Sequence, residues 1–487
     1  MVKYTPFPFQ ERCIEKGLQV LKDKKGRSEL IVAATAAGKS IIIAEIVKRL
    51  PKDGNIIVLQ PSKELLLQNL EKIESLGIKP AVYSASVGRK EVGRVTYATP
   101  LSLKNTSELV GKNIKYLIID EADLGTKSKS VIRKVAKDLK IKCKLGLTAS
   151  PIYLKSGLEG SKLIMMTNDG HPFFKDICEV VQPSEMVDLG RWTPLKYIDY
   201  GFDSTGLELN SNGSDWSEKS VLKNYIETDG EKRILEVLKN IPKNESVLIY
   251  TPGIDNVISL KNFLGDRAVC IYSGMKDSER SENVASFKSG KVQVMVNDSI
   301  LVQGFDYPNL RHIIDSAATK SARIYMQKLG RAVRVLKGKK VATIHDLAGN
   351  FEFFGRVEDF NFEKVGNYGW GMFSKDRLLT GVPLAENVNI TKDDLLKGKL
   401  PEKKQGGKKQ FYDFSFRFKE DPVFNFGKHK GKKLSKIYET DKGYLMWIIK
   451  PETNFNFGSN KQLKRAIEHI FRNRSGNTNT NSKVSNR

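Results

Sequence analysis

The sequence predicts an α/β fold: two tandem parallel sheets covered by helices, followed by a small C-terminal module. Short apolar runs alternate with helical patterns from about residue 5 to 150, and again from about 230 to 350. Such alternation is typical of parallel sheets. A loop ending in Gly38-Lys39-Ser40 follows the first apolar run. Because the second block has no such loop, its sheet would not bind a nucleotide alone.

The apolar runs give the expected strands. Those of the first block are Leu30–Ala33, Ile56–Gln60, Val95–Ala98, Tyr116–Ile119 and Lys144–Leu147. Those of the second block are Val247–Tyr250, Ala268–Tyr272, Val292–Val296, Arg311–Asp315 and Lys340–His345. The expected domains are 1–155, a connecting region 156–228 with a strand at Leu195–Tyr200, 229–350, an extension and basic linker 351–410, a basic module 411–473 and a polar tail 474–487. The tail has the composition of a disordered segment.

The segment Ala33–Ser40 reads AATAAGKS and lies between an apolar run and a helical pattern, Ile41–Leu50. This is the context that a phosphate-binding loop requires. Backbone N–H groups at the helix start, including those of Ala37 and Gly38, would surround the phosphates. Lys39 would reach the β- and γ-phosphates, and Ser40 would ligate Mg²⁺.

The tetrad Asp120-Glu121-Ala122-Asp123 directly follows the apolar run Tyr116–Ile119. One carboxylate would bind Mg²⁺, here Asp120, and Glu121 would orient and deprotonate the attacking water. The loop and the tetrad, in this order, predict an enzyme that hydrolyses a nucleoside triphosphate.

Composition narrows the choice of partner. The formal net charge is +25 over 487 residues, which favours a polyanion and first of all nucleic acid. The four scattered cysteines indicate neither a zinc site nor a disulfide framework, and predict an intracellular protein. No stretch approaches the ~18 apolar residues of a membrane span, and the first ten residues lack an apolar signal core. We therefore expect a cytoplasmic protein without a membrane partner.

Further motifs follow in a fixed order. Gln10, in the run Phe7–Gln10, could read an adenine edge with its amide. The others are 58–68 (VLQPSKELLLQ), 97–100 (YATP), 148–150 (TAS), 303–308 (QGFDYP) and 325–334 (YMQKLGRAVR).

This series resembles the superfamily 2 helicases and translocases over residues 5–350. The resemblance implies two RecA-like domains with ATP between them. It implies roles for Gln10, Lys39, Ser40, Asp120 and Glu121 on the first domain, and for Gly304, Asp306, Gln327, Arg331 and Arg334 on the second. It also implies nucleic-acid contacts by Ser62, Lys63, Thr99 and Thr251.

Arg331 and Arg334 are three residues apart, so on a helix they would share one face. They could point together at the γ-phosphate only when the two domains close, which would make hydrolysis depend on closure. The alternative is an exposed basic helix face.

The surroundings of the DEAD tetrad favour DNA over RNA. DEAD-box RNA helicases usually carry Pro-Thr-Arg-Glu-Leu-Ala, Ser-Ala-Thr and His-Arg-x-Gly-Arg, whereas this chain reads PSKELL, TAS and QKLGR. It looks more like the DNA-directed group with restriction-enzyme motors and bacteriophage helicases, which act in DNA repair, recombination and replication. If the origin is a phage, the compartment is the bacterial host. The alternatives are an ATP-dependent RNA helicase, or an annealing protein that uses ATP as a switch.

The C-terminal stretches 424–434 (FNFGKHKGKKL) and 443–449 (GYLMWII) resemble a small module appended to exonuclease X-like proteins. Lys428, Lys430 and Lys432 would present charge to phosphates. The alternatives are a folded unit with a solvated basic hairpin around a Tyr444/Trp447 core, or a docking site for a protein partner.

Overall fold

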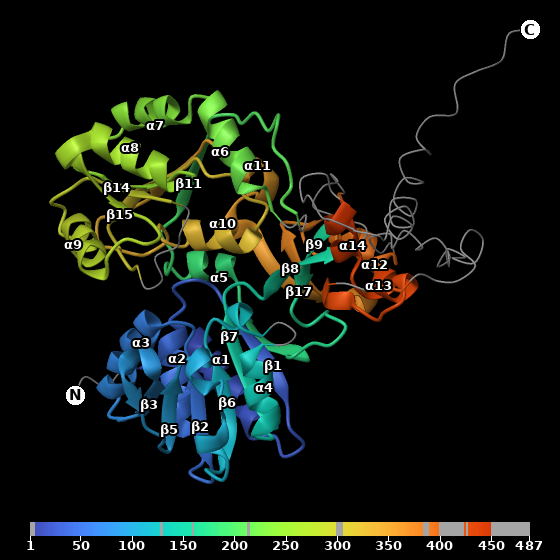
Figure 1. The fold of residues 1–487 in the computed structure, drawn as a ribbon. Coiled ribbons are helices and arrows are strands. Elements are labelled where there is room, and N and C mark those ends of the chain that lie inside the picture. Colours follow the sequence, from blue (N-terminus) through green and yellow to red (C-terminus); the bar gives the residue numbers. More distant parts are fainter. Residues whose placement is uncertain are drawn as a thin grey trace, which may run out of the picture. The chain divides into compact units, whose positions relative to one another are not determined.

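The computed structural model describes residues 5–126, 130–157, 160–211, 215–298, 305–382, 389–398, 423–424 and 427–449 (Figure 1). The chain forms two compact units, residues 1–401 and 402–487. The first contains both sheets.

The first sheet has eight strands in the order β10-β1-β7-β6-β2-β5-β3-β4. Their bounds are β1 Ser28–Ala33, β2 Asn55–Leu59, β3 Ala81–Ser84, β4 Arg89–Lys90, β5 Val95–Ala98, β6 Ile114–Ile119, β7 Cys143–Thr148 and β10 Asp176–Val181. All six residues of β1 are buried, as expected where helices cover both faces of a parallel sheet. Those helices are α1 Pro8–Leu21, α2 Lys39–Arg49, α3 Lys63–Ser75 and α4 Val131–Asp138 (Figure 1).

The second sheet has six strands, all parallel, in the order β11-β16-β15-β12-β14-β13. They are β11 Leu195–Asp199, β12 Ser246–Tyr250, β13 Ala268–Ile271, β14 Val294–Asn297, β15 Leu310–Asp315 and β16 Ala342–Asp346. The accompanying helices are α5 Pro183–Asp188, α6 Glu218–Glu227, α7 Gly230–Lys239, α8 Ile254–Leu264, α9 Asp277–Lys288, α10 Ala322–Leu329 and α11 Asn350–Phe354.

The predicted fold class is confirmed, and each expected strand overlaps an observed one. The expected connecting region contains two strands that belong to the large sheets. Strand β10 pairs with β1, and β11 pairs with β16. The polar residues within β10, Asp176 and Glu179, hid this strand from a prediction based on apolar runs.

We call the first sheet with its helices the first half of the first unit, and the second sheet with its helices the second half. The chain after the second sheet forms an extension that contacts the first half of the unit again. Strands β17 Phe360–Val365, β18 Gly369–Ser374 and β19 Arg377–Leu378 form a small antiparallel sheet, with helix α12 Lys392–Leu396 after it. The Gln182 amide donates to the Phe362 carbonyl at 2.9 Å and accepts from its N–H at 3.1 Å. A separate two-stranded hairpin is formed by β8 Ile152–Gly157 and β9 Gly160–Met165. The extension therefore joins the two halves by a second connection.

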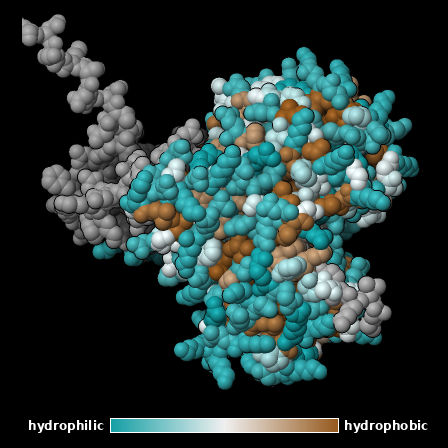
Figure 2. Space-filling model, turned by 180° about the vertical axis from the view of Figure 1, so that it is seen from behind, coloured by the Kyte–Doolittle hydropathy of each residue, from teal (hydrophilic) through white to brown (hydrophobic). Residues whose placement is uncertain are grey.

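In the second unit, helices α13 Leu434–Thr440 and α14 Lys442–Ile449 follow a short turn, Gly427–His429. Its buried residues include Phe424, Leu434, Ile437, Leu445 and Ile448. The expected tail 474–487 and most of the basic linker lie outside the described residues. None of the helices in the described parts is long and apolar enough to cross a membrane. Figure 2 shows hydrophilic residues over most of one face, with apolar ones in scattered groups.

Candidate functional site

The expected phosphate-binding loop connects β1 to α2 and contains two residues with positive φ. Gly38 precedes α2 with φ of +80°, and Ala36 has φ of +68°. A Cβ on Gly38 would lie 2.6 Å from the Gln10 amide nitrogen. Two constraints therefore require glycine at position 38: the positive φ and the close approach of the Gln10 amide.

Gln10, on the first turn of α1, is buried against this loop. Its amide nitrogen donates to the Ala37 carbonyl at 2.9 Å, and its amide oxygen accepts from the Phe7 N–H at 3.0 Å. The amide is therefore held in one orientation beside the loop. Its predicted contact with adenine stays a prediction.

Lys39 and Glu121 form an ion pair across the site, with Nζ and Oε1 3.2 Å apart. Burial alone would lower the pKa of Lys39, but the carboxylates of Glu121 and Asp120 more than offset it, so that this pKa is raised. Glu121 also has a left-handed backbone conformation, with φ of +44°. This conformation is uncommon for residues other than glycine. A triphosphate would compete with Glu121 for Lys39.

Asp120 is buried at the end of β6. It accepts from the Glu121 N–H and from the Asn69 amide, both at 3.0 Å. Burial and the neighbouring Glu121 carboxylate raise the pKa of Asp120. A divalent cation bound at Asp120 would lower that pKa again. The Asp120 carboxylate and the partly exposed Ser40 hydroxyl are oxygen ligands of the kind Mg²⁺ prefers. No group of three or more His, Cys, Asp or Glu suited to a metal occurs in the described part of the chain.

Asp123 connects three segments. It accepts from the Thr148 hydroxyl at 2.7 Å and from the Ser150 hydroxyl at 3.3 Å. Arg323, on α10 of the second sheet, donates to it through Nε at 2.6 Å. The Asp123 side chain is fully buried, so this ion pair links the two halves through a desolvated carboxylate. Sequence reasoning missed Arg323, although it lies one helical turn before Gln327.

Arg331 and Arg334 are held within the second half. Arg331 donates through Nη1 to the Phe305 carbonyl at 2.7 Å, and Arg334 donates through Nε to Asp306 at 2.8 Å. The helix α10 ends at Leu329, so the expectation that both arginines share a helix face is wrong. The chain turns after Gly330, where a Cβ would lie 2.9 Å from Thr35 of the phosphate-binding loop. Gln327 is half-buried, and Gly304 lies outside the described residues.

A second contact crosses between the halves at the same loop. The indole N–H of Trp192, which lies between α5 and β11, donates to the Thr35 carbonyl at 2.7 Å. Residues from both sheets therefore meet at the phosphate-binding loop.

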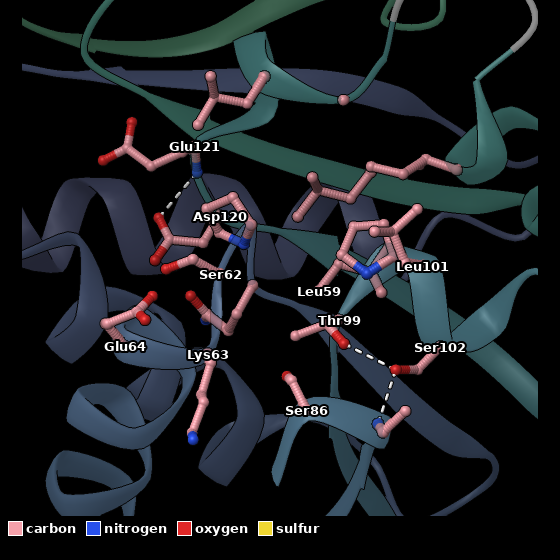
Figure 3. Close-up of a pocket in the computed structure, with 18 residues that line it drawn as sticks. Leu59, Ser62, Lys63, Glu64, Ser86, Thr99, Leu101, Ser102, Asp120 and Glu121 are labelled. Carbon is pink, nitrogen blue, oxygen red and sulfur yellow. Dashed lines mark hydrogen bonds between the residues drawn. The ribbon is translucent and has the colours of Figure 1, made fainter. Parts of the chain in front are cut away.

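The expected nucleic-acid residues of the first half line a pocket of about 740 Å³ at the ends of β2, β5 and β6. Figure 3 shows Ser62 and Lys63 at the start of α3, with Thr99 and Ser102 nearby. Lys63 is exposed, whereas the Thr99 hydroxyl is hydrogen-bonded to Ser102 at 2.9 Å. The expected nucleic-acid contact of Thr251 is corrected, because its side chain is fully buried and cannot contact a nucleic-acid strand in this structure.

In the C-terminal unit, Lys428 is paired with Asp441 at 2.7 Å and lies over the Tyr444 ring. Lys428 and His429 lower the pKa of Asp441 to about 2. Lys430 and Lys432 are exposed, and half of the Trp447 surface is exposed too. Trp447 is therefore only partly a core residue.

Three protein-family models match the chain. "Type III restriction enzyme, res subunit" covers residues 3–153, and "Helicase conserved C-terminal domain" covers residues 230–336. A short third match, "Exodeoxyribonuclease X-like C-terminal", covers residues 424–452.

Among curated proteins, the chain is similar to one described as a mitochondrial ATP-dependent helicase of Schizosaccharomyces pombe. The two are 27% identical over 70% of this chain and 56% of that protein. A protein of Methanocaldococcus jannaschii, described as an ATP-dependent RNA helicase, is 25% identical over 64% of this chain and 79% of its own length. The chain thus spans little more than half of the first relative.

A solved structure shares the fold. A fragment described as the HsdR subunit of a type I restriction enzyme from Vibrio vulnificus matches with a TM-score of 0.55, at 16% identity, over 72% of this chain and 66% of that one. The chain is thus similar to helicases over a stretch that includes parts of both sheets.

Proposed function

We propose that this protein is an ATP-dependent DNA helicase or translocase that unwinds or remodels DNA in replication, recombination or repair. One observation carries the proposal: side chains of both sheets converge on the phosphate-binding loop and the DEAD tetrad. Arg323 reaches Asp123, and Trp192 reaches Thr35. A nucleotide bound at that loop would therefore be sensed by both halves.

In this proposal the first half binds and positions ATP. Lys39 exchanges Glu121 for the phosphates, and Gln10 contacts the adenine. Ser40 and Asp120 hold Mg²⁺, which supplies charge stabilisation for the phosphoryl group. Glu121, released from Lys39, orients the attacking water and accepts its proton.

The second half contributes positive charge on closure. Arg331 and Arg334 would leave the Phe305 carbonyl and Asp306 and turn towards the γ-phosphate, with Gln327, Gly304 and Asp306 lining that side. Hydrolysis then requires closure, and repeated closure moves the two halves along a strand. This requirement also argues against an annealing protein that uses ATP only as a switch, because a switch does not need Glu121 and both arginines.

The DNA preference rests on the net charge of +25 and on the departures from RNA-helicase motifs at residues 61–66, 148–150 and 327–331. It is further supported by the restriction-enzyme model matched over residues 3–153. The test is steady-state ATPase activity with single-stranded DNA, forked DNA, four-way junctions and RNA of matched sequence and length, at one salt concentration. We expect DNA to stimulate more.

An ATP-dependent RNA helicase is the second candidate, favoured by the relative from Methanocaldococcus jannaschii. Equal or greater stimulation by RNA would favour it and overturn the DNA assignment. In either case the site of action is the cytoplasm, that of a bacterial host if the chain comes from a phage.

The C-terminal module is proposed to bind DNA through Lys430 and Lys432, whereas Lys428 is engaged by Asp441. Removing one lysine–phosphate contact lowers the slope of log affinity against log salt by about 0.7–0.9. Charge reversal at Lys430 and Lys432 should thus reduce the slope measured on forked DNA by about 1.4–1.8, and deletion of residues 410–487 should do so at least as much. Slopes equal to that of the unchanged protein in both variants would indicate a protein partner instead.

A further inference from the structure

A single buried amide connects the pocket of Figure 3 to the expected magnesium ligand. Asn69, in the middle of α3, donates through Nδ2 to the Gln60 amide oxygen at 2.7 Å and to Asp120 Oδ2 at 3.0 Å. Both hydrogens of that nitrogen are thereby used. Asn69 and Gln60 are almost completely buried, at 3% and 0% exposed.

Both ends of this connection lie next to the candidate nucleic-acid contacts. Gln60 lines the pocket together with Pro61, Ser62 and Lys63 (Figure 3). The Ser62 hydroxyl accepts from the Leu65 N–H and caps α3, so the position of Ser62 determines where the helix begins. Asn69 lies on that helix, and Asp120 lines the same pocket from the end of β6. A displacement of Ser62 or Lys63 would thus be carried along α3 to Asn69.

The network is incompletely satisfied. Gln60 Nε2 and Asn69 Oδ1 are buried and have no hydrogen-bond partner among the described residues. Buried polar groups without partners are costly. A second arrangement, in which α3 and Gln60 shift, could give these two atoms partners.

We propose that Asn69 is a positioning residue that transmits occupancy of the pocket by a nucleic-acid strand to Asp120. The proposal rests on the proposed function. A strand seated at Ser62 and Lys63 shifts the start of α3, and the Asn69 amide reorients the carboxylate that holds Mg²⁺. Strand binding and nucleotide binding are then coupled, and the coupling must be equal in both directions.

The test uses the full-length chain with Asn69→Leu, which keeps the size of the side chain and removes the amide. One measurement is the ratio of ATPase rates with and without single-stranded DNA. The other is the DNA dissociation constant with and without a non-hydrolysable ATP analogue and Mg²⁺. The coupling between two such sites is typically about 5–150-fold, and in the variant we expect it to fall to within about twofold of unity. The stimulated ATPase rate should fall more than the basal rate.

Asn224→Leu is the matched control. Asn224 is also a buried helical asparagine that donates two hydrogen bonds through Nδ2, at 2.8 and 3.3 Å, but to the backbone carbonyls of Asp203 and Thr205 on the second half. It should keep the coupling. If Asn69→Leu does not fold, Gln60→Met removes the other end of the same network and should also reduce the coupling.

The outcomes separate the two proposals. Unchanged coupling in Asn69→Leu or Gln60→Met, with the original protein stimulated by DNA or RNA, overturns the role of Asn69 and leaves the helicase assignment intact. An equal loss of coupling in Asn224→Leu also overturns it, because the effect would then follow from reduced stability. An original protein that no nucleic acid stimulates overturns both.

Discussion

The two halves of the first unit prepare their functional side chains in different ways. In the first, these side chains contact one another: Lys39 pairs with Glu121, and Gln10 binds the Ala37 carbonyl. In the second, Arg331 and Arg334 are engaged by their own half. In the proposed function the first half needs only the exchange of Glu121 for phosphates at Lys39, whereas Arg331 and Arg334 must leave their own half before they contribute to hydrolysis.

One contact between the two halves is an ion pair at the DEAD tetrad. Asp120, Glu121 and Asp123 bring three carboxylates together at the end of β6, and burial with the Glu121 charge raises the pKa of both Asp120 and Asp123. Lys39 offsets part of this charge from within the first half. Arg323 offsets another part from the second half through its ion pair with Asp123.

The largest expected effect concerns the first half alone. Glu121→Gln should slow ATP hydrolysis by about 10²–10⁴-fold while leaving the nucleotide bound, because the amide cannot accept the proton of water. Lys39→Ala should abolish the phosphate contact and weaken nucleotide binding as well. Steady-state ATPase and fluorescent-nucleotide binding distinguish these outcomes. Near-normal turnover in Glu121→Gln would remove Glu121 from the role of general base.

The second effect tests whether the arginines of the second half act after rearrangement. Arg331→Ala or Arg334→Ala should cut turnover by about 10³-fold or more, as loss of an arginine finger does. Nucleotide affinity should fall much less, since the first half holds the phosphates. If either variant instead failed to bind ATP while turnover per bound ATP stayed normal, the comparison between the halves would be wrong for that arginine.

A third and smaller effect concerns the contact between the halves. Arg323→Ala leaves the Asp123 carboxylate buried with only the Thr148 and Ser150 hydroxyls as partners. We expect kcat to fall by roughly 10-fold, the loss of about one charged hydrogen bond, with little change in KM for ATP. Arg323→Lys keeps the charge and should recover part of kcat. An unchanged kcat in Arg323→Ala would show that closure does not use this ion pair.

The sequence predicts the first half of the site better than the second, for a physical reason. The phosphate-binding loop and the DEAD tetrad are local, because each follows its own strand. Arg323 and Asp123 are 200 residues apart, and Trp192 and Thr35 are 157 apart. Such contacts depend on how the two sheets pack, which no local pattern records.

The same distinction holds for the fold. Most central strands contain a short apolar run, which is why the sequence predicts them. The strand β10 carries polar residues at a sheet edge and escapes prediction, whereas β11 is predicted as a strand but placed in the connecting region. The turn after Gly330 also escapes prediction; at Gly330 a Cβ would lie 2.9 Å from Thr35 of the other half, a contact that no local pattern records.

The smallest expected effect distinguishes the halves by their response to acid. In the second, His345 contacts the Tyr200 hydroxyl at 2.9 Å and His312 at 3.1 Å, and His312 contacts Glu245 at 2.7 Å. Burial, with His312 and Lys196, lowers the pKa of His345 to about 4. Among the described residues, the first sheet contains no buried histidine.

The sign follows from the two pKa values of His345, about 6.5 when unfolded and about 4 when folded. Between them the unfolded chain binds a proton that the folded chain does not, so the stabilising contribution is complete above pH 6.5 and declines as pH falls. Each pH unit between the two pKa values changes the contribution of His345 to the free energy of unfolding by about 1.4 kcal/mol, which gives about 3 kcal/mol over the whole interval. Asp346, whose pKa burial and Asp315 raise to about 6, acts in the opposite direction. The measurement is therefore the difference in unfolding free energy between the original protein and His345→Asn from pH 7 to 4. A difference independent of pH would show that His345 titrates normally.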